Sequence, residues 1–411
     1  MMPAYLRPLL AVSLFSLTSP ALADWNQWRG PQRDGSCAGA KWPEKLTGLK
    51  EKWRLPLEAS YSGPVTNGKL VFTTESKGKE LELAHAVDAA TGKLVWSAQW
   101  EGYQGVPFFA ARNGDWMRST PAVDETTLYV AGMKDVLVAL DAATGKERWR
   151  VDFPKDLKAS SQSFGYVCSP MLDGDALYTH AGAGFCKLEK KSGKLLWRSL
   201  DDGGGMMGGS FSSPVIATLG GKRQVVTQGR TVLSGLDVDS GTVLWSQPVK
   251  AFRGMNIFTP VVQGDRIFTS AYDGSSQAWD VTKEAGLKTT LAWEHKSEGY
   301  MSTPVVIGGK VFMHQRNRRF VCLDMATGRQ QWLSEQKFGE YWSLVYQGDR
   351  ILALDQNGTL YLIRANPEKL EILDERKLTK EECWAHLAVE DGMLYVRELK
   401  ALVAYEWKAG D

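Results

Sequence analysis

The sequence predicts an all-β fold, an eight-bladed β-propeller whose blades are four-stranded antiparallel sheets. Two repeated patterns carry this prediction. An acidic residue is followed four residues later by Gly and eight residues later by Trp, and a Ser/Thr-Pro step precedes a short apolar strand. The five copies of the first pattern are Asp88, Gly92, Trp96; Asp141, Gly145, Trp149; Glu189, Gly193, Trp197; Asp237, Gly241, Trp245; and Asp324, Gly328, Trp332. A repeat period of roughly 40–50 residues indicates a propeller, a solenoid or an array.

Residues 118–149 show the elements of one repeat in order. A Ser-Thr-Pro step leads into an apolar strand, and the strands LYVAG, DVLVAL and one ending at Trp149 follow, separated by turn residues. No segment has a helical period, so four antiparallel strands are expected. The acid can accept hydrogen bonds from turn amides, and Gly supplies the positive φ of a tight reversal. The Trp can cover one sheet and pack on the next. We therefore predict a structural interblade role for Trp53, Trp96, Trp149, Trp197, Trp245, Trp293 and Trp332.

The strand starts give the number of blades. Six starts contain Pro, at Pro64, Pro121, Pro170, Pro214, Pro260 and Pro304; Ser or Thr stands directly before Pro in all but the first, where Ser62 stands two residues before it. Two further starts lack Pro, near Ser343 and His386, which makes eight blades; seven is the neighbouring alternative. The fifth unit is irregular because a longer excursion separates its acid, Asp280, from Trp293.

The last repeat ends after three strands, near Trp407. Residues 47–54 resemble the final strand of a repeat that has no partners before it. We expect this strand to pair with residues 401–407 and close the ring. Closure would remove open sheet edges, which otherwise template aggregation.

The N-terminal residues 1–23 are predicted to be a cleavable Sec-type signal peptide. Arg7 precedes an apolar run, and Ala21-Leu22-Ala23 offers a small-x-small cleavage site. The run is too short for a stop-transfer helix, although an uncleaved anchor is the alternative. Residues 24–48 form a lead-in, and residues 49–411 form a single propeller domain. We expect a periplasmic or secreted protein without stable membrane insertion.

Composition excludes some classes of partner. The formal net charge is +2 and no basic patch occurs, so nucleic-acid binding is not expected. The cysteines, five in number, do not suggest a disulfide framework. Cys168 and Cys186 fall on the first and third strands of one blade, which is too far apart for an unstrained bridge, so both are predicted to be core residues.

The repeated S/T-x-P-V starts and A-L-D-x-x-T-G-K-x-x-W hairpins resemble those of the PQQ-like β-propeller repeat proteins. The resemblance covers roughly residues 49–407. This group includes quinoprotein alcohol dehydrogenases and the BamB outer-membrane assembly factor. The segment WNQWRGPQRDG (25–35) resembles the start of exported PQQ-like proteins of planctomycetes. Because the group is mixed, the resemblance implies the fold more strongly than the function.

The resemblance also allows an enzyme, and the residues can be compared with it. Quinoprotein dehydrogenases of this group carry an adjacent Cys-Cys pair and hold calcium through carboxylate and amide groups, with a further Asp as base. No two cysteines are adjacent here, no CxxCH haem motif occurs, and no such acidic set stands at the strand starts. The histidines lack metal spacing, and no GxSxG motif is present. No catalytic residue, metal or cofactor is therefore predicted; PQQ with Ca²⁺ is the alternative.

One surface can be nominated as a ligand or partner site. The residues just before each first strand should surround one mouth of the central channel, and most are aromatic. They are Tyr61, Arg118, Tyr166, Phe211, Asn256 with Phe258, Tyr300, Tyr341 with Trp342, and Trp384. These rings either bind a ligand or plug the taper of the ring. The insertion 102–116 is the candidate lid or contact loop.

The sequence therefore predicts an exported, monomeric propeller that acts as a non-catalytic binding or scaffold module through one face. The expected partner is a protein or a glycan. Two alternatives remain: a PQQ-dependent quinoprotein dehydrogenase and a BamB-like scaffold for outer-membrane protein assembly.

Overall fold

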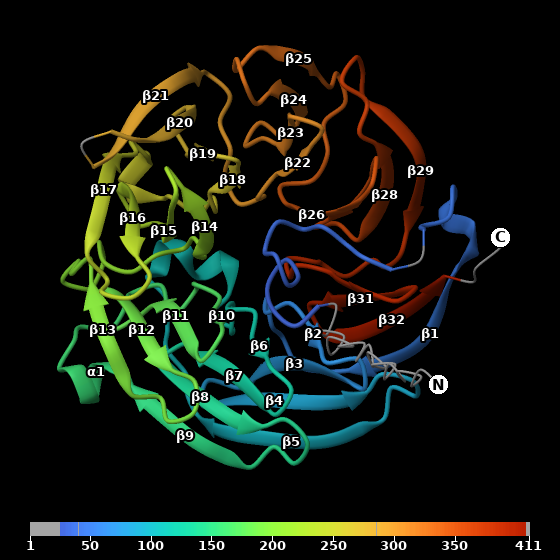
Figure 1. Ribbon diagram of the computed structural model, residues 1–411. Coiled ribbons are helices and arrows are strands. Elements are labelled where there is room, and N and C mark those ends of the chain that lie inside the picture. Colours follow the sequence, from blue (N-terminus) through green and yellow to red (C-terminus); the bar gives the residue numbers. More distant parts are fainter. Residues whose placement is uncertain (1–24, 40, 285, 408–411) are drawn as a thin grey trace, which may run out of the picture.

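The computed structural model describes residues 25–39, 41–284 and 286–407, so the predicted signal peptide lies outside the described residues. Eight four-stranded antiparallel sheets form a closed ring, as Figure 1 shows. The prediction of eight blades is confirmed, and the alternative of seven is wrong.

The strands follow the chain blade by blade, from the inner strand outward. Blades 1 to 3 comprise β2 (Val65–Thr66), β3 (Leu70–Lys77), β4 (Leu81–Asp88), β5 (Leu94–Glu101); β6 (Ala122–Val123), β7 (Thr127–Gly132), β8 (Val136–Asp141), β9 (Glu147–Asp152); and β10 (Met171–Asp173), β11 (Ala176–His180), β12 (Phe185–Glu189), β13 (Leu195–Ser199). Blades 4 to 6 comprise β14 (Val215–Leu219), β15 (Lys222–Gln228), β16 (Val232–Asp237), β17 (Val243–Pro248); β18 (Val261–Gln263), β19 (Arg266–Ser270), β20 (Ser276–Lys283), β21 (Leu287–His295); and β22 (Val305–Ile307), β23 (Lys310–His314), β24 (Phe320–Asp324), β25 (Gln330–Leu333). Blade 7 comprises β26 (Trp342–Gln347), β27 (Arg350–Asp355), β28 (Thr359–Arg364) and β29 (Glu371–Lys377), and blade 8 comprises β30 (Ala388–Glu390), β31 (Met393–Glu398), β32 (Ala401–Trp407) and β1 (Leu49–Pro56).

The ring closes where the two ends of the propeller meet. Strand β1 pairs antiparallel with β32, from Leu49 opposite Trp407 to Pro56 opposite Ala401, and supplies the outermost strand of blade 8. The predicted closure by the N-terminal strand is confirmed, with the strand two residues further along than expected.

The repeated acid and Gly build the hairpin between the third and fourth strands. In blade 2, Asp141 Oδ1 accepts hydrogen bonds from the backbone N–H of Thr144 at 2.9 Å and from its hydroxyl at 2.8 Å. Gly145 has φ +73°, and a Cβ atom there would lie 2.5 Å from the Trp96 ring of blade 1. Gly is therefore required both by the turn and by the close approach of the neighbouring blade.

The hairpin Trp residues join neighbouring blades in six of seven cases. The indole N–H of each of these donates to a backbone carbonyl oxygen of the next blade: Trp53 to Ala89, Trp96 to Ala142, Trp149 to Lys190, Trp197 to Val238, Trp293 to Met325 and Trp332 to Asn366. Trp245 differs, because its indole donates at 2.6 Å to the Gln224 side chain of its own blade.

Helices are few and short. They are η1 (Leu46–Gly48), η2 (Phe108–Asn113), α1 (Phe153–Leu157) and η3 (Phe252–Gly254). Within the described residues, none of them is long and apolar enough to cross a membrane. Cys168 and Cys186 are buried, and no disulfide is formed by any of the five cysteines, all of which lie in the described part of the chain.

Candidate binding site at the channel mouth

The lead-in segment closes one end of the central channel. Residues 25–37 run through the middle of the ring, where the segment is drawn in blue in Figure 1. The carbonyl oxygens of Trp25 and Asn26 accept hydrogen bonds from Thr66 in blade 1 and Val123 in blade 2. Ser36 forms a parallel bridge with Tyr346 in blade 7. The segment therefore bonds to inner strands around the ring and forms a plug.

Two buried arginines anchor this plug. Arg33 donates to the carbonyl oxygens of Pro214, Pro170 and Ser169 at 2.9, 3.0 and 3.2 Å. Arg29 donates to the carbonyl oxygen of Pro304 at 2.7 Å. Burial lowers the pKa of Arg29 to about 10 and that of Arg33 to about 9, so both remain cationic at neutral pH.

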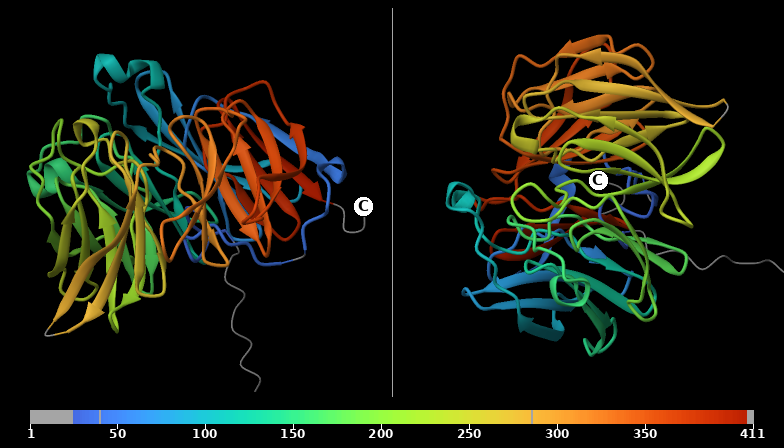
Figure 2. Two further views of the ribbon diagram at one scale, coloured as in Figure 1. Left: turned by 90° about the horizontal axis from the view of Figure 1, so that it is seen from above. Right: turned by 90° about the vertical axis from the view of Figure 1, so that its left-hand side faces the viewer.

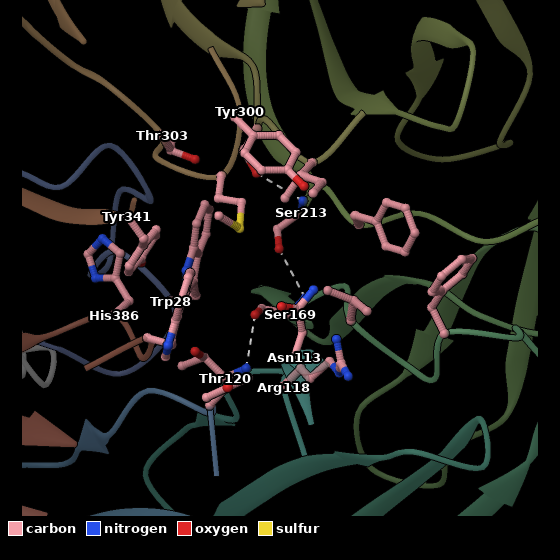
Figure 3. Close-up of a pocket in the computed structure, with 18 of the residues that line it drawn as sticks. Trp28, Asn113, Arg118, Thr120, Ser169, Ser213, Tyr300, Thr303, Tyr341 and His386 are labelled. Carbon is pink, nitrogen blue, oxygen red and sulfur yellow. Dashed lines mark hydrogen bonds between the residues drawn. The ribbon is translucent and has the colours of Figure 1, made fainter. Parts of the chain in front are cut away.

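Above the plug lies a cavity of about 290 Å³. Trp28 forms part of its floor, with the Arg29 and Arg33 guanidinium groups 5.6 and 5.5 Å from the ring centroid. The first-strand starts of all eight blades contribute to the wall, and Figure 3 shows several of these side chains pointing inward. The wall residues on these starts are Tyr61, Arg118, Thr120, Val167, Ser169, Phe211, Ser213, Ile257, Thr259, Tyr300, Met301, Thr303, Tyr341, Trp384 and His386.

Six of the nominated mouth residues line this cavity: Tyr61, Arg118, Phe211, Tyr300, Tyr341 and Trp384. The nomination is wrong for Tyr166, Phe258 and Trp342, which are fully buried between blades. Asn256 is buried too, with its amide bonded to the Arg230 carbonyl at 3.0 Å.

The reason for these errors is strand alternation. Val167, Ile257 and Tyr341, each one position away from a misplaced residue, face the cavity instead. Successive side chains of an extended chain point to opposite sides, so a shift of one residue moves a side chain from the channel into the interblade core. Trp342 illustrates the buried alternative, since its indole donates at 3.0 Å to Asp355 within blade 7.

A belt of hydroxyl groups surrounds the cavity. Thr120 Oγ1 accepts the Gly63 N–H, Ser169 Oγ accepts that of Thr120, Ser213 Oγ accepts that of Ser169, and Thr259 Oγ1 accepts that of Ser213, each at 3.0 Å. Bonds of this belt between lining residues are drawn as dashed lines in Figure 3. The hydroxyls hold blades 1 to 5 together, and as acceptors each still carries a proton that can be donated.

The insertion 102–116 overhangs the cavity. Ala110 and Asn113, both on η2, are part of the lining. Figure 2 (left) shows η2 standing above the ring. Phe108 and Phe109 point away from the core, with 90% and 57% of their surfaces exposed. The loop therefore carries both part of the pocket and an exposed apolar tip.

The inner wall is cationic and the outer rim carries acids. Arg118 is mostly buried, and its guanidinium donates to the Gly114 carbonyl. Glu340 lines the rim, and Glu382 accepts the Trp384 indole N–H at 2.9 Å. Burial lowers the pKa of His386 to about 3, so this residue adds no charge at neutral pH.

These residues do not fit a quinone cofactor with its calcium ion. Calcium takes six to eight oxygen ligands, with carboxylates prominent among them. Glu340 is the single carboxylate in the lining, and the described residues contain no group of three or more His, Cys, Asp or Glu side chains that could hold a metal. No adjacent cysteines face the cavity.

Sequence reasoning missed Trp28, Arg29, Arg33 and the hydroxyl belt. The belt has a signal, because its members Thr120, Ser169, Ser213 and Thr259 are the residues immediately before the repeated Pro. The plug has no such signal, since the lead-in is not part of a repeat and its partners lie 136 to 275 residues away.

Comparison with known sequences and structures identifies a matching family and several similar proteins. A family model described as outer membrane protein assembly factor BamB matches residues 80–334, more than half of the chain. The BamB of Yersinia pestis is 23% identical over 289 residues, covering 66% of this chain and 66% of its own length. The polyvinylalcohol dehydrogenase of a Sphingopyxis species is 27% identical over 213 residues, covering 46% of this chain but 31% of its own length. The crystal structure of BamB from Moraxella catarrhalis superposes with a TM-score of 0.63 at 16% identity, covering 88% of this chain and 99% of that chain.

Proposed function

This chain belongs to the family of the outer membrane protein assembly factor BamB, and on that premise we propose that it is an exported, non-catalytic binding module that holds a partner protein on one face of its propeller. The face is the one that carries the channel mouth. The names of its relatives describe them as assembly factors for outer membrane proteins, and such assembly is one role that a binding module of this kind can perform.

The observation that carries the proposal is a cluster of exposed apolar side chains around the mouth. Residues just before the first strands line the cavity, so each first strand runs away from the mouth, and the connections between a fourth strand and the next first strand return to it. Three of these connections carry an exposed apolar group, here called the apolar rim: Phe108, Phe109, Met206, Met207 and Phe252.

The apolar rim is continuous with the cavity. The Phe109 ring lies 6.1 Å from Phe164, which lies 5.3 Å from Phe211 in the cavity wall. Arg230 stacks on Phe211 at 4.4 Å and donates to the Met206 carbonyl at 3.2 Å. Apolar patches of this kind on soluble proteins mark interaction sites.

Exposed arginines beside the apolar rim indicate which charge the partner carries. Arg112 follows the exposed phenylalanines on η2, and Arg253 follows Phe252 on η3; both are exposed. A partner segment with apolar anchors flanked by acidic residues complements this surface. Because aromatic and Arg residues dominate binding energy, we expect Phe108 and Phe109 to be central contacts.

Photocrosslinking tests the proposal in cells that produce the protein. A photoreactive amino acid at position 108 should give an adduct with one defined partner, and the same amino acid at position 94 should not. Leu94 is the matched control because it is also exposed but lies on the outer strand β5 of blade 1. The purified partner should then bind the wild type at least ten times more tightly than Phe108→Asp/Phe109→Asp, with Leu94→Asp unchanged. Equal adducts from both positions, or binding unaffected by the double substitution, would refute the proposal.

A further inference from the structure

We propose that the central cavity binds the carboxylate-bearing end of an acidic saccharide. This ligand site lies inside the mouth that the apolar rim borders, and it rests on the proposed function in that both place binding on the mouth face. Four properties of the cavity favour such a ligand: its hydrogen-bond donors, its charge, its aromatic walls and its single entrance.

The cavity is rich in donors. Thr120, Ser169, Ser213 and Thr259 accept backbone N–H groups, and none of these hydroxyls donates a hydrogen bond to another described residue. The Nε atom of Arg118 is buried without a partner among the described residues. Unsatisfied donors in a buried site favour a ligand with many oxygen acceptors.

The cations around the cavity are held mainly by backbone carbonyl oxygens. Asp34, Asp115 and Asp202 lie near Arg29, Arg118 and Arg230, but no ion pair forms between them among the described residues. Arg29 and Arg33 below the floor, Arg118 in the wall and Arg230 behind it each donate to backbone carbonyl oxygens. No carboxylate accepts a hydrogen bond from any of the four within the described part of the chain. The acidic Glu340 lies at the rim, so a bound carboxylate is favoured at the depth of Arg118.

The aromatic residues supply the flat surfaces that a sugar ring needs. Tyr341 and Trp384 stack with ring centroids 6.0 Å apart and planes 19° apart, and Tyr61 lies 5.9 Å from Trp384. Trp28 adds a fourth ring below. The C–H faces of a pyranose pack against such rings while its hydroxyl groups meet the polar belt.

The entrance and size determine which part of the saccharide enters. The lead-in plug closes the far end of the channel, so a chain cannot thread through the ring. The cavity volume of about 290 Å³ lies at the small end of ligand pockets, which span roughly 300–1,000 Å³. The cavity therefore accepts one or two sugar units from the end of a chain.

Calorimetry with trigalacturonate tests this inference, using mature protein and galactotriose as the uncharged probe. We expect saturable binding of trigalacturonate and at least tenfold weaker binding of galactotriose. Arg118→Gln should weaken trigalacturonate binding at least tenfold, and Arg118→Lys should weaken it less. Arg329→Gln, at an exposed arginine on the β24–β25 hairpin outside the cavity lining, should bind as the wild type does. Trp384→Ala provides a second cavity variant, and thermal unfolding checks that each variant is folded.

The outcomes separate this inference from the proposed function. Equal binding of both sugars, absence of trigalacturonate binding, or wild-type affinity in folded Arg118→Gln and Trp384→Ala overturns the saccharide site. The Phe108→Asp/Phe109→Asp variant should keep its trigalacturonate affinity while losing the partner protein. Conversely, partner binding that persists in Arg118→Gln leaves the apolar rim intact as a docking surface.

Discussion

Trp96 shows how a single side chain joins two blades. Its ring packs on Gly145 of blade 2, and its indole N–H donates to the Ala142 carbonyl at 3.0 Å. The residue thus buries apolar surface and satisfies its one polar atom in the same contact. The spacing of acid, Gly and Trp in the sequence is the consequence of this interlock, because the Gly of one unit receives the Trp of the unit before it.

We expect Trp96→Ala to destabilise the protein by about 3–5 kcal/mol, as truncation of buried aromatics does. The midpoint of urea unfolding measures this loss. Leu94→Ala is the control on the same strand: Leu94 is half exposed, whereas Trp96 is 9% exposed. The control should change stability by about 0.5 kcal/mol or less. Equal effects of the two substitutions would contradict the interblade role.

Glu82 gives the fold a pH dependence. Its carboxylate accepts the Met133 N–H at 2.6 Å and the Trp100 indole N–H at 2.8 Å. Burial nevertheless raises the pKa of Glu82 from 4.5 to about 7. Between these values the folded state keeps a proton that the unfolded state has lost. This contribution to stability therefore falls as the pH rises from about 4.5 to about 7, and stays constant above.

Between pH 5 and pH 8 the free energy of unfolding of the wild type should fall by about 2–3 kcal/mol, since one unit of pKa corresponds to about 1.4 kcal/mol. The free energy of unfolding of Glu82→Gln should not show this fall. Urea titrations of both proteins at several pH values provide the measurement. Parallel pH profiles for the two proteins would show that Glu82 titrates normally.

The mouth residues mark the limit of prediction at the residue scale. The Ser/Thr-Pro repeat locates each strand start, but it does not say which of two adjacent side chains faces the axis. Tyr341 and Trp342 are both aromatic, and only the first reaches the cavity. A position just before a first strand locates the mouth only to within one residue, so Tyr166 and Phe258 are buried while their neighbours Val167 and Ile257 face the cavity.

At the scale of elements, the plug and the closing strand have different origins. Strand β1 has the sequence of a repeat strand, so its pairing with β32 is predictable from the periodicity. The plug bonds through Arg side chains to backbone carbonyl groups of several blades. Every residue has a backbone carbonyl group, so the sequence does not indicate which of them accept these bonds.

Substitutions of Arg33 test how much the plug contributes to stability. Arg33→Ala should lower stability by about 3 kcal/mol or more, because it leaves the carbonyl oxygens of Pro214, Pro170 and Ser169 without their charged donor in a buried site. Arg33→Lys should not restore it, since an ammonium group lacks the planar fork that spans three acceptors. Thermal unfolding compares both with Arg253→Ala, an exposed arginine on η3. Full rescue by lysine would contradict this account of the plug.

Two N-terminal truncations distinguish the contribution of the closing strand β1 from that of the plug. A chain that lacks residues 1–48 keeps β1 and should remain a monomer with reduced stability. A chain that lacks residues 1–56 exposes β32 and should aggregate or unfold without cooperativity. Gel filtration and denaturant unfolding distinguish the two, with a chain lacking residues 1–23 as reference. A stable monomer lacking β1 would show that closure is dispensable.

For the whole molecule, the fold was predictable and the chemistry of the cavity was not. The eight blades follow from local spacing, whereas the cavity draws its lining from every blade and from the non-repetitive lead-in. Relatives with this fold include a dehydrogenase and assembly factors, so the shape of the ring does not choose between them.

Addition of PQQ with Ca²⁺ to a chain lacking residues 1–23 should give no calorimetric binding and no dye-linked alcohol oxidation. The reason is the donor set, in which Glu340 is the one carboxylate of the lining. A known quinoprotein dehydrogenase serves as the positive control. Stoichiometric binding with alcohol turnover would restore the enzyme alternative.

The pairing of β1 with β32 also sets the timing of folding. The strand that completes blade 8 is made first and its partner is made last, so the seam stays open until nearly all of the chain has emerged. During synthesis, the early blades have an unpaired strand at one end until the last strand is made. A prematurely terminated chain can never seal, and its two exposed edges would make it recognisable to proteases and chaperones that act on unpaired strands.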